Sequence, residues 1–171
     1  MKFFRVLFVT FILISSTSEK TFSAEKNKDF DGKGGREDLS FLKAKNSNFK
    51  KGNDALKQAL KFKKKKKYEK ANIKFEKALK YFVEANNEAP NKIEVLIPLA
   101  FTYNEVGDHI MTEIYYKEGL YIEPKNILIN KSLGELYLST NRKALALERL
   151  EVLKDCNCQE YINLKNIVNK N

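Results

Sequence analysis

Several residue types that support catalysis are scarce in this chain of 171 residues. It contains no tryptophan, seven glycines and a single histidine, His109. No serine or cysteine nucleophile stands at a diagnostic spacing from that histidine, and the glycines form no phosphate-binding loop. No zinc signature is present either. We therefore expect a protein that is not an enzyme and has no catalytic residues, no cofactor and no metal, with His109 as a surface residue at the start of a helix.

Long apolar runs are also missing. A membrane span needs roughly 20 apolar residues, and the run over residues 3–14 falls short. Lys2 and Arg5 give a positive start, and small polar residues follow the run, which is the order of a secretory signal peptide. We expect cleavage after Ser18 or Ala24 and export, to the periplasm if the source is a bacterium. Without cleavage, the leader would keep the protein at the inner membrane.

Positive charge is concentrated in one segment. Residues 43–80 hold 15 lysines against three acidic residues, a net charge of +12, whereas residues 81–171 have a net charge of −3. Two interpretations stay open: a solvated helix surface whose lysine stems cover apolar area, or attraction to an acidic partner or an anionic envelope surface. No aromatic platform for stacking bases interleaves with these lysines, and nucleic acid is a poor candidate for an exported protein, so it is not an expected partner. Within this segment, we call the lysines between residues 63 and 77 the basic strip. It comprises Lys63, Lys64, Lys65, Lys66, Lys67, Lys70, Lys74 and Lys77.

Apolar periodicity divides the rest of the chain. Residues 25–51 are polar and predict a flexible linker after the leader over 1–24. From Gly52 onward, apolar residues recur at three- and four-residue steps, which indicates helices with one buried face. The segment from about Lys67 to Glu88 predicts a second helix two turns longer than its later counterparts.

A set of residues recurs after 34 positions. Such a period indicates a supersecondary unit that cannot bury its apolar face alone, so copies of it must stack. The first set is Leu99, Ala100, Tyr103, Gly107, Tyr116, Gly119 and Pro124, and the second is Leu133, Gly134, Tyr137, Asn141, Leu150, Leu153 and Cys158.

This pattern resembles the tetratricopeptide repeat (TPR), a family of paired helices that bind other proteins and rarely perform chemistry. The resemblance implies an all-α solenoid with small residues where the two helices of a pair cross, which would place Ala100 and Gly134 at such crossings. It implies a TPR domain over residues 52–169, with units at about 52–92, 93–126 and 127–160 and a capping helix over 161–169.

The resemblance also implies a concave groove lined by the first helix of each unit. The family's clamp for a C-terminal carboxylate is not met here, so a chaperone-tail receptor is not expected. An apolar middle and a mixed rim suit a helical or extended peptide with hydrophobic anchors, although Ile97, Phe101 and Leu128 could instead be core residues. No small-molecule substrate is expected. The predicted groove comprises Leu56, Leu60, Ile97, Phe101, Asn104, Glu105, Leu128, Lys131 and Glu135.

Two cysteines, Cys156 and Cys158, stand one residue apart. In an oxidising compartment two cysteines usually pair, and the separation between their Cα atoms can fall within disulfide reach. The pair is compatible with a structural bond or none, with a redox-responsive disulfide, with soft-metal binding completed by another chain, or with an intermolecular bridge.

These observations together predict an exported, non-enzymatic scaffold that mediates protein–protein interaction through its groove. The lysine-rich first unit would assist binding to an acidic partner or an envelope surface. The alternative is a redox-responsive adaptor that uses the two cysteines.

Overall fold

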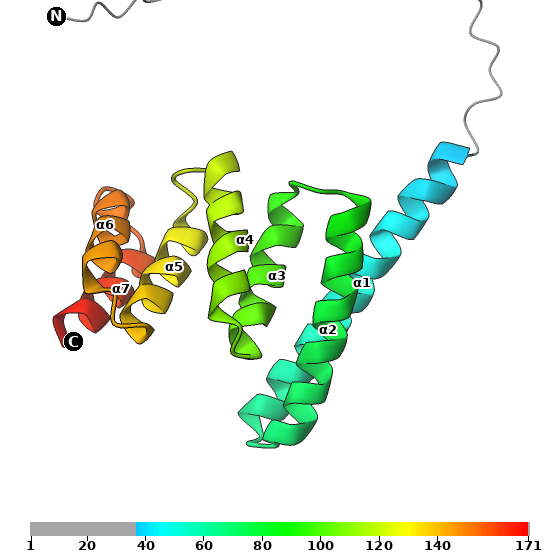
Figure 1. Cartoon of the computed structure of the whole chain (residues 1–171), viewed down its shortest axis with the longest axis horizontal. Coiled ribbons are helices and arrows are strands. Elements are labelled where there is room, and N and C mark those ends of the chain that lie inside the picture. The colour runs from blue at the N-terminus through cyan, green and yellow to red at the C-terminus, as the bar shows by residue number, and fades with distance from the viewer. Residues whose placement is uncertain (1–36, 171) are drawn as a thin grey trace, which may run out of the picture. The chain divides into compact units, whose positions relative to one another are not determined.

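Helix follows helix in the computed structural model, which describes residues 37–170, with side chains from residue 47 on (Figure 1). No strand occurs in this range, so the expected all-α fold is confirmed. The helices are α1 (Glu37–Lys64), α2 (Tyr68–Glu88), α3 (Ile93–Glu105), α4 (His109–Ile122), α5 (Ile127–Ser139), α6 (Lys143–Leu153) and α7 (Gln159–Lys170).

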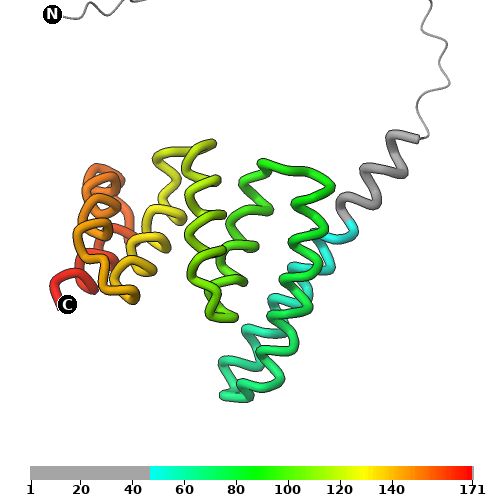
Figure 2. The backbone as a smooth tube through the Cα atoms, in the orientation of Figure 1, coloured from blue at the N-terminus to red at the C-terminus, as the bar shows by residue number. Residues whose placement is uncertain are grey.

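Consecutive helices form hairpins. The most extensive contacts join α1 with α2, α3 with α4, and α5 with α6, while α7 packs on both α5 and α6. Figure 2 shows these pairs following one another in chain order. The pairs are held in a row by α2 against α3 and by α4 against α5. The arrangement is an α-solenoid, and α7 covers its C-terminal end.

The first helix is longer than the apolar pattern indicated. It begins at Glu37, so residues 37–51 are helical where we predicted a flexible linker. Long-range contacts explain the difference: the ring of Phe49 lies 6.1 Å from that of Phe82, and Asn48 donates a 2.8 Å hydrogen bond to Glu88. Such contacts come from α2, 33 and 40 residues later, and leave no periodic signal in the polar segment itself.

The leader and the remainder of the predicted linker lie in residues 1–36, outside the described residues. Within the described residues, no helix combines the length and apolar character that crossing a membrane requires.

Four alanines lie completely buried in the hairpins. Ala59, Ala78, Ala100 and Ala146 are completely buried, and large side chains pack around them. Phe82 of α2, for example, is completely buried in a cluster that includes Ala78. Small side chains let helix backbones approach, so the surrounding large residues can fill the interior to its usual density.

Polar side chains form hydrogen bonds with the backbone at the starts of α4 and α5. The buried amide of Asn130 donates to the backbone oxygens of Pro124 and Asn126, at 3.0 and 2.9 Å. Asp108 and Asn126 cap α4 and α5 by accepting from the backbone amides of Met111 and Ile129, both at 3.0 Å. The turns before α4 and α5 are thereby held without leaving these groups unsatisfied.

Gly134 makes its closest approach to a different helix from the one we expected. A Cβ atom built on Gly134 would lie 2.7 Å from Cδ2 of Leu164, and its three nearest atoms all belong to that side chain. The tight crossing is therefore between α5 and the capping helix α7, not between α5 and its hairpin partner α6. Leu164 is completely buried, so it has little room to move aside.

We expect Gly134→Ala to lower the free energy of unfolding by about 1–3 kcal/mol, because overpacking at Leu164 outweighs the gain in helix propensity. Urea unfolding measures the change. In a Leu164→Ala background the same substitution should cost less, since the obstructing methyl groups are gone. If Gly134→Ala stabilises the otherwise unchanged protein, the close approach of α5 and α7 is not as described.

Candidate functional site

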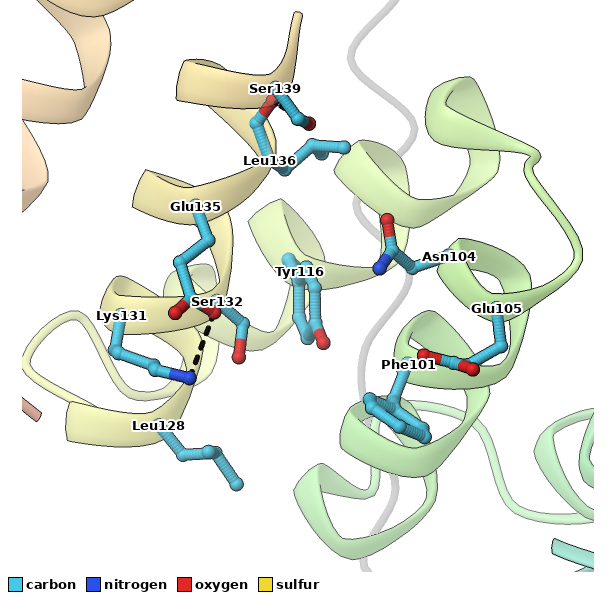
Figure 3. Close-up of a pocket in the computed structure, with 10 residues that line it drawn as sticks. All are labelled: Phe101, Asn104, Glu105, Tyr116, Leu128, Lys131, Ser132, Glu135, Leu136 and Ser139. Carbon is cyan, nitrogen blue, oxygen red and sulfur yellow. Dashed lines mark hydrogen bonds and ion pairs between the residues drawn. The ribbon is translucent and has the colours of Figure 1, made fainter. Parts of the chain in front are cut away.

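A pocket of about 370 Å³ opens between α3, α4 and α5 (Figure 3). Its size is within the range of about 300–1,000 Å³ that is usual for binding pockets. The residues that line it are Phe101, Asn104, Glu105, Tyr116, Leu128, Lys131, Ser132, Glu135, Leu136 and Ser139.

Four of the lining residues are apolar or aromatic and six are polar or charged. Phe101 comes from α3 and Leu128 from α5, and Tyr116 of α4 lies between the two sets of residues (Figure 3). Burial raises the pKa of Tyr116 to about 12, although its hydrogen bond with Ser132 acts in the opposite direction. The phenol is therefore neutral at physiological pH, and its hydroxyl adds a polar group without charge to the pocket.

The charges around the pocket are already paired within the chain. Lys131 and Glu135 form an ion pair of 2.8 Å along α5. Glu105 of α3 pairs with Lys63 of α1 at 2.5 Å. Because each carboxylate has a cationic partner, the pocket presents little net charge to an occupant. Its chemistry suits an apolar side chain with neutral hydrogen-bonding groups around it.

Six of the nine residues of the predicted groove line this one pocket: Phe101, Asn104, Glu105, Leu128, Lys131 and Glu135. Ile97 instead packs against the core cluster around Leu133, and Leu56 packs against two clusters of the first hairpin. Leu60 is 40% exposed on α1 and does not line the pocket. The pocket is thus formed by the second and third hairpins.

Sequence reasoning missed four lining residues: Tyr116, Ser132, Leu136 and Ser139. A signal for two of them was present. Ser132 and Ser139 continue the stripe that contains Leu128 and Glu135, because the four positions are spaced as i, i+4, i+7 and i+11 on α5. Tyr116 had no such signal, since it comes from the second helix of its hairpin.

The basic strip surrounds the turn between α1 and α2 and continues along α2. Seven of its eight lysines are exposed, and Lys74 is half-buried. Lys63 is the one that reaches the pocket residues, through its ion pair with Glu105. The strip and the pocket are therefore adjacent at this point, where α1 contacts α3.

A disulfide joins Cys156 and Cys158 in the turn between α6 and α7. Cys156 packs beside the buried cluster of Leu153, Leu164 and Val168. Neither cysteine lines the pocket. Over the described part of the chain, no cluster of three or more histidine, cysteine or acidic side chains is arranged to hold a metal.

A carboxylate outside the pocket lining joins α4 to α5 and to the turn after α5. Glu113, one turn before Tyr116, accepts hydrogen bonds from Arg142 Nη1 at 2.6 Å and from the Tyr137 hydroxyl at 3.2 Å. It also pairs with Lys117 at 2.7 Å, while Arg142 lies over the Tyr137 ring. Burial would raise the pKa of Glu113, but the bonds from Lys117 and Arg142 outweigh it and lower the pKa overall.

Comparison with solved structures places the fold among tetratricopeptide-repeat domains. The chain is similar to the TPR domain of OM64 from Arabidopsis, with a TM-score of 0.54 and 15% sequence identity. The match covers 72% of this chain and 98% of that domain. No protein-family model matches the sequence, and no curated protein matches it significantly. The expected TPR fold is thereby confirmed. A sequence identity of 15% establishes the fold alone.

We expect Glu113→Gln to lower the free energy of unfolding at pH 7 by about 1–3 kcal/mol, because charge-assisted hydrogen bonds are lost. The folded pKa lies below the unfolded value of about 4.3, so this stabilisation is present above that pH and disappears as pH falls through the folded pKa. Urea unfolding from pH 7 to pH 2 should show the two proteins converging at the acid end.

Glu118→Gln is the matched control, because Glu118 lies on the same helix and forms no ion pair with a described residue. A constant difference between Glu113→Gln and the unchanged protein down to the lowest pH would contradict the assignment.

Proposed function

We propose that this protein is an exported, non-enzymatic scaffold that binds another protein through the pocket between α3, α4 and α5. The proposal rests on one observation: six of the predicted groove residues line a single pocket in a TPR fold. Proteins with this fold are typically interaction scaffolds. The pocket adds a feature of peptide sites, namely apolar and aromatic side chains together with polar ones.

The bound segment is a peptide with one bulky apolar side chain. That side chain would lie among Phe101, Tyr116 and Leu128, while Asn104 and Ser132 offer hydrogen bonds to its backbone. In the chain by itself the Leu128 side chain is 48% exposed, so a bound peptide that covers it would remove apolar surface from water. Because the carboxylates of the pocket are internally paired, a strongly basic peptide is a poorer fit than a neutral one.

The basic strip would act at longer range. Its lysines are exposed except for Lys74, and one of them, Lys63, reaches the pocket residue Glu105, so the strip would raise the rate of encounter with an acidic partner or an anionic envelope surface. Lys63 also neutralises Glu105.

Export rests on the composition of residues 1–24. The intact mass of the protein purified from its native host distinguishes cleavage after Ser18 from cleavage after Ala24 and from an uncleaved leader. The redox-responsive adaptor remains the alternative, but the geometry does not favour it, because the disulfide of Cys156 and Cys158 lies apart from the pocket residues.

Substitution of Phe101 or Leu128 by alanine should reduce partner capture by about tenfold, because central apolar anchors carry most of the binding energy of an interface. The measurement is affinity capture from the native envelope, with quantitative mass spectrometry of the proteins retained by each variant.

Leu147→Ala provides the control. Leu147 is 47% exposed, as Leu128 is at 48%, but it lies on α6 and does not line the pocket. The same proteins should be retained by the unchanged chain and by Leu147→Ala. If the two groove variants retain them equally well and remain folded by circular dichroism, the pocket is not the binding site.

Replacing Lys64 to Lys67 with glutamate should slow association with the captured partner by about tenfold or more at low ionic strength. The difference should vanish near 1 M salt, where the Debye length is only about 3 Å. Surface plasmon resonance separates this effect on the association rate from the faster dissociation expected of the groove variants. An unchanged salt dependence would leave the lysines as ordinary solvated surface.

A further inference from the structure

A second pocket, distinct from the groove, lies between α1 and α2. It measures about 170 Å³, and we call it the lysine pocket. It is smaller than the roughly 300–1,000 Å³ of most drug-sized sites, which suits a small polar group. The residues that line it are Lys51, Asp54, Ala55, Gln58, Lys74, Lys77 and Tyr81.

Helix geometry brings these residues together from two faces. On α1, Lys51, Asp54 and Gln58 occupy positions i, i+3 and i+7. On α2, Lys74, Lys77 and Tyr81 have the same spacing of i, i+3 and i+7. Residues at these intervals share one face of a helix, and α1 and α2 pack along their length. Three lysines from two helices therefore line one cavity.

The three lysines lack anionic partners. Within the described range, neither Lys51, Lys74 nor Lys77 forms an ion pair with a carboxylate. The ammonium of Lys51 lies 5.7 Å from the centroid of the Tyr81 ring, which keeps it near the cavity. Lys74 is half-buried, so its position is more restricted than that of a freely solvated lysine.

The geometry points to a binding site for a phosphate group in the lysine pocket. The site goes beyond the groove and does not depend on it, although it shares Lys74 and Lys77 with the basic strip. Three ammonium groups would surround the phosphate oxygens, and the Gln58 amide and Tyr81 hydroxyl are further donors at the cavity. Convergence of charge on a cavity, rather than charge along a surface, distinguishes this site from the rest of the strip.

Asp54 is the one group at the cavity that opposes an anion. Its carboxylate repels a phosphate and offsets part of the lysine charge. Substitutions at the site should therefore change the phosphate affinity in opposite directions. Asp54→Asn should raise it, and the lysine substitutions should lower it.

The probe is inorganic phosphate, titrated into the isotope-labelled protein at about 0.15 M ionic strength, where the Debye length is about 8 Å, and followed through backbone amide chemical shifts. Saturable shifts are expected near residues 51–58 and 74–81. The double variant Lys74→Gln and Lys77→Gln should weaken the affinity at least about tenfold, because hydrogen bonds to charged groups are lost. Asp54→Asn should strengthen it by a few fold.

The double variant Lys64→Gln and Lys65→Gln is the matched control, since it removes the same charge from the basic strip but leaves the lysine pocket intact. It should change the affinity by less than about twofold, because exposed charges at a distance are screened. Equal weakening by both double variants, or shifts that do not saturate, would overturn the site in favour of diffuse charge attraction.

Vesicles of phosphatidylcholine with and without phosphatidylglycerol then identify the source of the phosphate. If the pocket variant loses binding to the anionic vesicles while the control variant keeps it, the phosphate belongs to a lipid headgroup. If no variant binds vesicles but inorganic phosphate still saturates the pocket, the ligand is a soluble phosphate compound. Neither result depends on the groove, which Phe101→Ala tests separately.

Discussion

The structure depends on each hairpin covering the apolar face of the next one. A helix pair of this length has too little interior of its own to be stable, so its stability comes from the neighbouring pair. Ala100 shows how this works, because it is completely buried in a cluster that also contains Leu133 and Leu136 of α5, in the following hairpin. At the C-terminal end α7 performs the same task by placing Leu164 against Gly134.

That stacking also creates the pocket. The residues of α3 and α5 face each other across Tyr116 of α4, and Glu113 links α4 to Tyr137 of α5 and to Arg142 in the turn after it. Phe101 belongs to both the pocket and the core, because it lines the pocket and also packs against the buried cluster of Ala59, Ala71 and Phe75. Leu128 is 48% exposed at the pocket, whereas Glu113 lies outside the pocket lining and joins α4 to Tyr137 of α5.

Charge is divided along the same framework. The first hairpin carries most of the positive charge, and the later hairpins form the near-neutral pocket. Lys63 joins the two regions by pairing with Glu105. A scaffold built in this way can use one region for attraction at long range and another for contact at short range, because electrostatic forces reach farther than apolar packing.

Local patterns in the sequence were enough to predict the helices from residue 68 onward. The expected helix from about Lys67 to Glu88 is observed as Tyr68–Glu88, because its apolar residues recur at helical spacing and a proline follows it. The repeat of 34 residues likewise indicated paired helices in a stack. Six of the pocket residues could be named for the same reason, since the first helix of each unit has a regular inward face.

Tertiary structure alone decided the remaining features, because each depends on residues distant in sequence. The segment before Gly52 is helical because Phe49 and Asn48 find partners on α2. Tyr116 enters the pocket from a second helix, and Gly134 is required by Leu164 of the capping helix. The sequence by itself determined where helices form and which faces are apolar, since these follow from spacing along one chain segment. Which faces meet, and which lysines converge on a cavity, was decided only by the packing of one helix on another.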